Sequence, residues 1–124
     1  MKAFIFDMDG TIVNNTSYHT KAWLQFLSNN NIFIKEGELG SKIYGINNEI
    51  IPRFFGNDLS IEKIKKLAAE KEKIYRTFYQ PLIEELKGLK KLLNLAKQKE
   101  ILIALATMSN VENISFIIDA LGIR

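Results

Sequence analysis

The sequence contains no cysteine, and this absence excludes several kinds of chemistry. A chain without thiols forms no disulfides, holds no thiolate-bound metal and has no cysteine nucleophile. No apolar run is long enough to cross a membrane, and the short apolar run near the start leads into Asp7, so we expect no signal peptide. These features predict a cytoplasmic protein without a membrane partner.

An excess of charge of one sign is also absent, because 17 lysines and arginines stand against 14 aspartates and glutamates, a net charge of +3. The most basic stretch, residues 63–76, interleaves its lysines with glutamates. Glu62 and Lys66, and likewise Glu72 and Arg76, have the i,i+4 spacing of helical ion pairs. The stretch therefore predicts a solvated helix face and no nucleic-acid partner.

The chain does contain enough apolar residues, 47% of 124, to bury one modest core. Two short apolar runs, residues 2–6 and 101–106, are too continuous for half-exposed strands and predict parallel strands covered on both faces. Gly45 and Pro52 interrupt one of the helical patterns between them. The periodicity predicts helices at about 16–30, 40–54, 60–79, 83–99 and 110–121.

Two strands separated only by helices indicate an α/β layer with a helical module inserted after the first strand. We expect the α/β part to comprise residues 1–14 and 81–124, and the helical module to comprise residues 15–80. Pro81 marks the return from the insertion.

The first apolar run ends in two aspartates, Asp7 and Asp9, within the segment FIFDMDGTIV of residues 4–13. If the extended chain continues to residue 9, the two carboxylates point to the same side, about 7 Å apart. At an effective dielectric constant of about 20 they repel each other by roughly 2 kcal/mol. A hard divalent cation such as Mg²⁺, which takes one or two carboxylates together with phosphate oxygens, would offset this repulsion. Gly10 permits a sharp turn whose N–H groups can bind an anion.

Two other structures can carry a D-x-D-G pattern. A calcium loop of the EF-hand kind needs a third acid before its glycine and a glutamate at the loop's last position, where this chain has Tyr18. A plain turn without chemistry is the other, since aspartate is a common turn residue. The pattern favours a catalytic pair of carboxylates over both.

Ligands of open α/β sheets bind beyond the carboxyl ends of the strands. The residues that follow the two predicted strands are Asp7, Asp9, Thr107 and Ser109. For Ser109 we favour a structural role, because Glu112 follows it at the spacing of a capping box that opens the last helix. A helix N-terminus at this place would also suit an anion.

Two motifs resemble those of the haloacid dehalogenase superfamily. FIFDMDGTIV is similar to its first motif, and IALAT at residues 103–107 resembles its second, an apolar strand that ends in threonine or serine. Between them, YHTKAW at residues 18–23 and the helix with Lys71 resemble the helical cap of the beta-phosphoglucomutase and sugar-phosphate phosphatase branch. The resemblance covers the whole chain and implies a Rossmann-like α/β core, with only its first part present, and an inserted α-helical cap. Dehalogenases of the superfamily lack the second aspartate, so Asp9 implies phosphoryl transfer.

The resemblance implies a role for each matching residue of the core. Asp7 would be the nucleophile that forms an aspartyl-phosphate, and its other oxygen would bind Mg²⁺. Asp9 would be the general acid and base, with its backbone carbonyl also on the metal. Thr107 would bind the phosphoryl group together with the backbone N–H groups of Met8, Asp9 and Met108. The alternative for Thr107 is a strand-end hydroxyl turned to the backbone or to solvent.

In the cap, His19, Trp23 and Lys71 are candidate substrate-binding residues. The position of His19 contacts the acid/base aspartate in the resembling mutases, although a lone histidine is usually structural. Trp23 lies one helical turn from His19 on an apolar stripe, so core packing is its favoured role. Lys71 falls within the apolar stripe of the helix at residues 60–79 and needs a partner there, such as a phosphate or sugar oxygen. Alternatively, it extends out of the stripe into solvent.

The sequence also departs from the family pattern. The mutases have a cap-loop arginine that binds the non-transferring phosphate, whereas this chain has Asn48 there and Arg53 further along. The lysine of the third motif and the acidic pair of the fourth would lie beyond Arg124.

We therefore expect a magnesium-dependent phosphatase of a small sugar phosphate, incomplete without a C-terminal half. A beta-phosphoglucomutase-like phosphomutase is the alternative within the family. An alternative of another class is a non-catalytic truncated remnant or interaction module that self-associates through its sheet.

Overall fold

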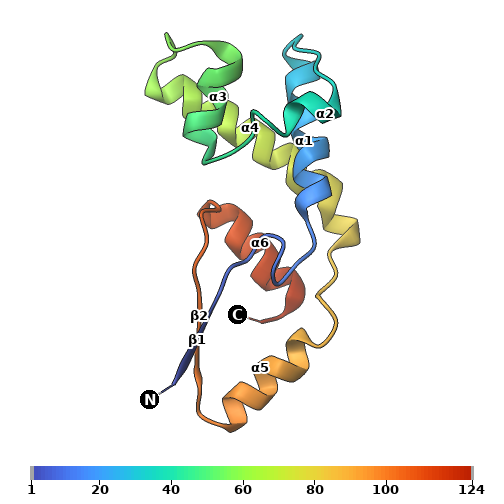
Figure 1. Cartoon of the computed structure of the whole chain (residues 1–124), viewed down its shortest axis with the longest axis vertical. Helices are drawn as coiled ribbons and strands as arrows, with labels where there is room; N and C mark the ends of the chain where they lie inside the picture. Colours follow the sequence, from blue (N-terminus) through green and yellow to red (C-terminus); the bar gives the residue numbers. More distant parts are fainter. Residues whose placement is uncertain (1, 124) are drawn as a thin grey trace. The chain divides into compact units, whose positions relative to one another are not determined.

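The computed structural model describes residues 2–123, which fold as two compact units (Figure 1). Residues 17–81 form the helical unit. The residues before and after this segment form the strand unit, which contains both strands.

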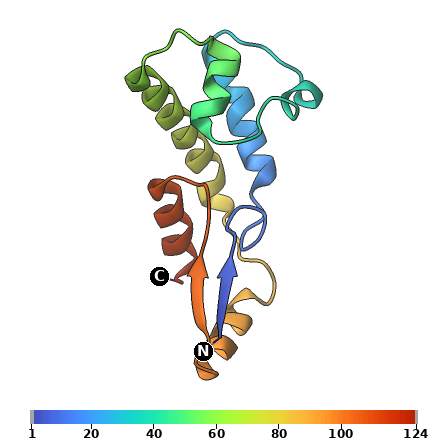
Figure 2. The ribbon, with the colours of Figure 1, turned by 60° about the vertical axis from the view of Figure 1, so that its left-hand side comes forward.

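The strand unit is built on one pair of parallel strands, β1 (Ala3–Phe6) and β2 (Leu102–Leu105). Each residue of β1 aligns with the residue at the same place in β2, and both strands run in the same direction (Figure 2). Parallel strands combined with helices confirm the expected α/β class. Both predicted strands are also confirmed, each slightly shorter than predicted.

The prediction that the strands are covered on both faces is wrong for the described residues. Ile5 is 72% exposed, Leu102 is 55% exposed and Ile103 is 42% exposed. The described sheet has two strands, so each strand has one edge whose backbone groups are not paired within the sheet. Much of the apolar side-chain surface of the strands is also exposed. Exposed apolar surface of this kind typically marks an interaction site.

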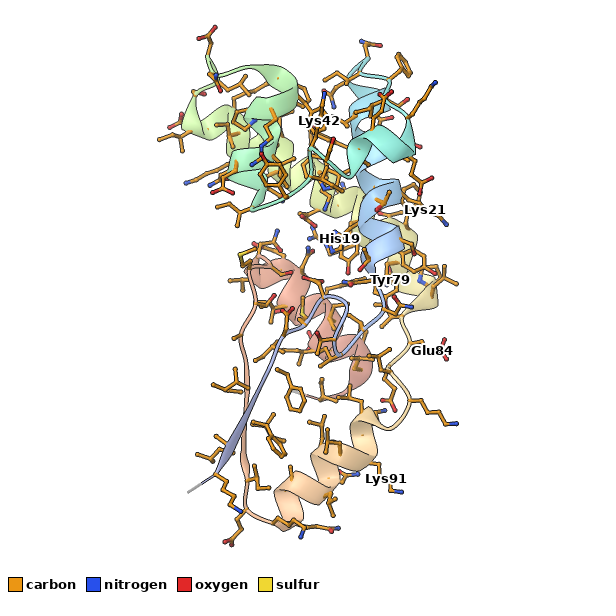
Figure 3. All side chains as sticks on the ribbon, viewed as in Figure 1. His19, Lys21, Lys42, Tyr79, Glu84 and Lys91 are labelled. Atoms are coloured by element: carbon orange, nitrogen blue, oxygen red, sulfur yellow. The ribbon has the colours of Figure 1, made fainter. Side chains whose placement is uncertain are left out.

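Two helices complete the strand unit, α5 (Leu89–Gln98) and α6 (Val111–Leu121). α5 begins later than the predicted residue 83, because Gly88 just before it adopts a left-handed conformation with φ of 91°. Its exposed residues include Lys91 (Figure 3). α6 ends as predicted at Gly122, which has φ of 66°.

Four helices account for the helical unit, and they share one apolar core. The helices are α1 (Thr16–Asn29), α2 (Glu36–Leu39), α3 (Asn47–Phe55) and α4 (Ile61–Tyr79), followed by the 3₁₀ turn η1 (Gln80–Leu82). The buried side chains of the core are Trp23, Phe26, Leu27, Leu39, Ile50, Ile51 and Leu67. Their spacing of three to four residues within α1 is that of an amphipathic helix, which is why the periodicity predicted this element.

The helical pattern predicted at residues 40–54, broken by Gly45 and Pro52, is only partly confirmed: the break at Gly45 is present, and the break at Pro52 is not. α2 ends before this range begins, and α3 occupies only its second part. Gly45 lies between them with φ of 91°, a conformation that no right-handed helix contains. Pro52 lies within α3 and does not end it. No helix among residues 2–123 is both long enough and apolar enough to cross a membrane.

Candidate active site

Both strands of the strand unit end at the same edge of the sheet, because they are parallel. The Ala106 N–H donates to the Phe6 carbonyl at 2.8 Å, which continues the ladder one residue past β2. Asp7 therefore leaves β1 beside the place where Thr107 leaves β2. Ligands of open α/β sheets bind beyond this edge.

The loop after β1 is a tight turn around Met8, whose carbonyl accepts from the N–H groups of Thr11 at 3.1 Å and Ile12 at 3.0 Å. Gly10 in this turn has φ of 73°, a conformation that strains residues with a side chain. Oδ1 of the exposed Asp7 carboxylate accepts from the Met8 N–H at 2.8 Å, which orients this carboxylate. β1 ends before Asp7, so the condition that the strand continues to residue 9 is not met.

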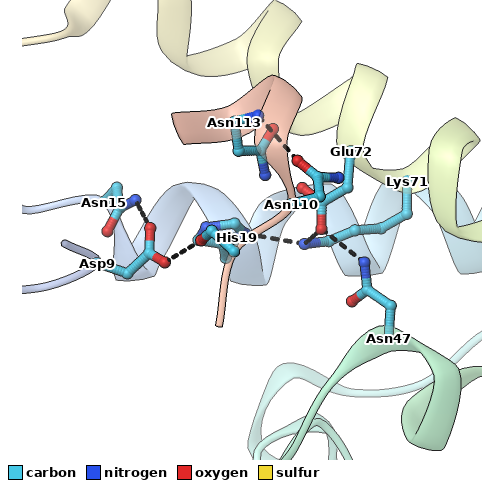
Figure 4. A network of polar contacts seen from close by, with 9 residues as sticks. Asp9, Asn15, His19, Asn47, Lys71, Glu72, Asn110 and Asn113 are labelled. Atoms are coloured by element: carbon cyan, nitrogen blue, oxygen red, sulfur yellow. Dashed lines mark hydrogen bonds and ion pairs between the residues drawn. The ribbon is translucent and has the colours of Figure 1, made fainter. Parts of the chain in front are cut away.

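The Asp9 carboxylate is held at both of its oxygens (Figure 4). The Asn15 side-chain amide donates to Oδ1, and the Ser109 hydroxyl donates to Oδ2. Asn15 is fully buried, and its own Oδ1 accepts from the Gly10 N–H at 3.1 Å. Asp9 is thus fixed by one donor from the loop after β1 and one from the loop after β2.

The loop after β2 carries the other candidates for phosphoryl binding. The Ser109 N–H donates to Thr107 Oγ1 at 3.1 Å, so the Thr107 oxygen is turned toward backbone. This bond uses a lone pair of the hydroxyl oxygen and not its hydrogen. The Met108 side chain is 76% exposed and the Met8 side chain is buried, but the predicted role of both rests on their backbone N–H groups.

The capping box predicted for Ser109 and Glu112 is wrong. Asn110 is the N-cap of α6, and its side-chain oxygen accepts from the Asn113 N–H at 2.8 Å. The Ser109 hydroxyl donates to Asp9 instead. Asparagine caps a helix as well as serine does, so the helix can begin one residue later and release the serine.

In the helical unit, His19, Trp23 and Lys71 lie together. The Lys71 ammonium nitrogen is 2.8 Å from Nδ1 of His19 and 5.0 Å from the centre of the Trp23 ring. Lys71 is 2% exposed, so the alternative in which it extends into solvent is wrong.

Lys71 has an anionic partner within the chain. Glu72 Oε1 lies 3.1 Å from the Lys71 ammonium nitrogen and accepts from the Asn47 side-chain amide at 2.8 Å. Glu72 is 5% exposed, so the prediction that it belongs to a solvated helix face is wrong. Lys71 therefore does not need a substrate oxygen to compensate its burial.

Trp23 is part of the apolar core, as favoured from the sequence. It is 3% exposed, and its ring packs edge-to-face against Phe26 with centres 5.8 Å apart. The His19 ring is stacked on Tyr75, with centres 3.8 Å apart and planes 6° from parallel. Packing accounts for Trp23 without a ligand, whereas His19 has both a packing face and polar ring atoms.

Arg53 is tied to the loop before α3. Its guanidinium lies 3.7 Å from the centre of the Tyr44 ring, and it donates to the carbonyls of Lys42 and Tyr44. The Glu49 carboxylate accepts a hydrogen bond from the Ile46 N–H at 3.2 Å. The Cβ of any side chain at Gly45 would clash with this carboxylate. The loop is therefore held by its own residues, and Arg53 contributes to holding it.

Asp7 and Asp9 are the carboxylates at the described sheet edge that could contribute to a Mg²⁺ site. Among residues 2–123, no group of three or more histidine, cysteine, aspartate or glutamate side chains could hold a metal ion. Mg²⁺ commonly uses one or two carboxylates and completes its shell with water and phosphate oxygens, and the exposed Asp7 fits this pattern. Both Asp9 side-chain oxygens accept hydrogen bonds, which is compatible with the role that the resemblance implies for its backbone carbonyl as a metal ligand.

The sequence interpretation missed Asn15, Asn47 and Glu72 as members of these two polar groups, and it misassigned Ser109. Asn15 had a usable signal, because an asparagine shortly after a D-x-D-G turn can bond back to that turn. Asn47 and Glu72 had none, since their contact joins two helices that are distant in the sequence.

The chain is similar to known proteins both in sequence and in structure. The sequence model of a hydrolase family described as haloacid dehalogenase-like hydrolase matches residues 1–124. A HAD hydrolase of family IA, variant 3, from Entamoeba histolytica HM-1:IMSS is 28% identical with a TM-score of 0.86, over 97% of this chain and 55% of that chain. The beta-phosphoglucomutase from Clostridium difficile is 28% identical with a TM-score of 0.80, over 99% of this chain and 57% of that chain.

A more distant structure shares the fold. CbbY from Rhodobacter sphaeroides, solved in complex with phosphate, is 22% identical with a TM-score of 0.79, over 97% of this chain and 56% of that chain. The chain therefore spans little more than half the length of the solved structures that it matches.

Proposed function

Because the chain belongs to the haloacid dehalogenase-like hydrolase family, we propose that it carries the nucleophile of a magnesium-dependent phosphatase for small sugar phosphates. The observation that supports this most is the unequal environment of the two aspartates. Asp7 presents an exposed carboxylate oriented by one N–H, while Asp9 is fixed by Asn15 and Ser109. An accessible carboxylate suits a nucleophile, and a positioned carboxylate suits a general acid and base.

The proposed reaction has two steps. An Asp7 oxygen forms a bond to phosphorus while the bond from phosphorus to the sugar oxygen breaks, and protonated Asp9 gives its proton to that oxygen. Water then attacks phosphorus while the Asp9 carboxylate takes its proton, which releases phosphate and restores Asp7. The Thr107 hydroxyl and the Met108 N–H would donate to the phosphoryl oxygens, while the Met8 N–H, which donates to Asp7 Oδ1, orients the nucleophile. Mg²⁺, held by Asp7 and the Asp9 carbonyl, would offset part of the negative charge of this group.

We propose that the complete activity also needs polypeptide beyond these 124 residues. The matched structures are longer by nearly half of their own length. By resemblance, the further part would bring the lysine and the acidic pair of the family's third and fourth motifs. The exposed apolar strand residues, such as Ile5, support a strand unit that further polypeptide covers.

The contacts of Arg53 favour a phosphatase over a phosphomutase. A phosphomutase must hold a second phosphate, and the arginine that does so in the resembling mutases is replaced by Asn48. Arg53 stacks on Tyr44 and donates to two loop carbonyls, so it serves the loop. Hydrolysis of a monophosphate needs no such second anion site.

Removal of divalent metal is expected to abolish phosphate-ester hydrolysis by the native gene product, whose length is first fixed by its intact mass. The substrate is p-nitrophenyl phosphate, and kcat/KM is measured with excess EDTA and again after Mg²⁺ is added in excess of the chelator. We expect loss and recovery, because the negative charge on the phosphoryl group would be uncompensated without the metal. Hydrolysis that is unchanged by the chelator would contradict the proposal.

A second candidate function, an interaction module, is favoured by the open sheet of the strand unit. A mainly apolar cavity of about 590 Å³ is lined by residues of β2, α5 and α6. Its apolar lining residues include Phe6, Leu89, Leu93, Ile101, Leu105 and Ile118. A strand pair with such a surface is marginal alone and gains stability when another chain covers it.

For this second candidate, we expect the 124-residue chain to self-associate in sedimentation velocity experiments, with a mean mass that rises with concentration. Ile5→Glu should reduce the association, because it places a charge on the open sheet. Ile61→Glu is the matched control, because Ile61 is 69% exposed in the helical unit. A monodisperse monomer at all concentrations would contradict self-association.

A further inference from the structure

A polar cluster in the helical unit, formed by the buried Lys71 and Glu72 with the half-buried His19 and Asn47, is connected from end to end (Figure 4). The Asn47 side-chain amide donates to Glu72 Oε1 at 2.8 Å, and the same oxygen lies 3.1 Å from the Lys71 nitrogen. That nitrogen lies 2.8 Å from His19 Nδ1. Helices α1, α3 and α4 each contribute to the cluster, so it is a product of the packed unit.

Within this cluster, Lys71 is the residue that is protonated and positively charged. The Glu72 carboxylate is in contact with it, and the rings of Trp23 and Tyr75 lie 5.0 Å and 5.6 Å from its nitrogen. A carboxylate and two aromatic faces all favour a cation. The ordinary pKa of a lysine side chain also exceeds that of a histidine side chain by about four units. The side chains of Lys71 and Glu72 are 2% and 6% exposed, so water does little to weaken this pair.

The charge on Lys71 decides how the His19 ring is protonated. A lysine ammonium has three N–H donors and no acceptor, so the contact at 2.8 Å requires His19 Nδ1 to accept. A neutral imidazole that accepts at Nδ1 carries its proton on Nε2. The Tyr75 ring, stacked at 3.8 Å, keeps the imidazole plane in the orientation that this contact needs.

We infer that Glu72, anchored by Asn47, is a positioning residue that acts through Lys71 to hold His19 in the tautomer with its proton on Nε2. Lys71 serves within this cluster as the donor to His19, and its charge is matched by Glu72. The ring then acts as a donor at Nε2, which is the chemistry that recognises phosphoryl, carboxylate or hydroxyl oxygens. This deepens the proposed function by giving His19 a defined role toward oxygen, but the ring state can be measured without turnover.

The tautomer of His19 can be measured directly, because the chain contains one histidine. Histidine labelled with ¹⁵N gives one pair of ring signals in long-range ¹H–¹⁵N spectra of the 124-residue chain. We expect the neutral ring to show a protonated Nε2 and an unprotonated Nδ1, with this tautomer in excess by about tenfold or more, since a hydrogen bond from a charged donor shifts an equilibrium by that factor. A dominant Nδ1–H tautomer, or a nearly equal mixture, would overturn the inference.

Glu72→Gln tests the positioning role. It removes the negative charge beside Lys71, so the tautomer ratio of His19 should fall by about threefold or more. Glu70→Gln is the matched control on the same helix, because Glu70 is exposed, and it should leave the ratio unchanged.

Asn47→Ala is the second test, and it keeps both charges of the pair. It removes only the hydrogen bond that anchors Glu72, so we expect a smaller fall in the tautomer ratio and a folded chain. This variant decides the question if Glu72→Gln does not fold. The positioning role would be refuted if the tautomer ratio stayed at the wild-type value in Glu72→Gln and Asn47→Ala, or in whichever of them folds. Because no substrate is used, failure of the proposed phosphatase activity would leave this result standing, and the reverse also holds.

Discussion

Replacement of Asp7 by asparagine is expected to lower kcat for p-nitrophenyl phosphate by about a thousandfold or more in the native gene product. A carboxylate oxygen can attack phosphorus, whereas an amide oxygen is a much weaker nucleophile. The amide has nearly the same size, and its oxygen can still accept from the Met8 N–H as Oδ1 of Asp7 does. The loss should therefore appear in kcat without loss of the fold, which circular dichroism can verify.

Asp58→Asn is the matched control for this substitution. Asp58 is exposed in the loop between α3 and α4 and belongs to the helical unit. The same chemical change at this position should leave kcat and KM unchanged. If Asp7→Asn retained wild-type turnover while the metal dependence persisted, the nucleophile would have to be another group, and the proposed mechanism would fail.

The strands and the first motif could be predicted because their signals are local. Short continuous apolar runs favour buried strands, and a D-x-D-G sequence at the end of such a run puts two aspartates where the strand ends. The covering of the strands could not be predicted correctly from the same runs. An apolar run such as residues 101–106 shows what a strand needs, but it does not show which chain supplies it.

The site residues differ in the same way. Asp7 and Thr107 follow the ends of the two strands, so they could be proposed as site residues from their position alone. Ser109 and Asn110 are both good cap residues, so the local sequence could not decide which would cap α6 and which would reach Asp9. The three-dimensional contact with Asp9 decides it, and that contact joins residues 100 positions apart.

Lys71 shows the limit of periodicity most clearly. The apolar stripe of α4 correctly indicated that this lysine needs a partner. The partner is its sequence neighbour Glu72, although adjacent residues of a helix do not face each other along one stripe. The pair forms because both side chains are buried and Asn47, from another helix, binds the glutamate. A helical pattern read from one segment contains no information about that third residue.

Removal of one charge of the Lys71–Glu72 pair is expected to lower the free energy of unfolding of the helical unit by about 3–5 kcal/mol. Glu72→Gln leaves a buried ammonium without its counter-ion, and Lys71→Met leaves a buried carboxylate. The chain has one tryptophan, Trp23, in the core of the helical unit, so its fluorescence reports the unfolding of this unit in urea.

The double variant with Lys71→Met and Glu72→Gln separates the ion pair from the packing of the two side chains. Once both charges are gone, neither is stranded, so the double variant should be more stable than the sum of the single changes predicts. Glu70→Gln and Lys73→Met are matched controls at exposed positions of α4 and should each change stability by less than about 0.5 kcal/mol. Additive effects of the two buried substitutions would mean that Lys71 and Glu72 are not energetically coupled. The two side chains would then be close without stabilising each other, and Glu72 could not act on His19 through Lys71.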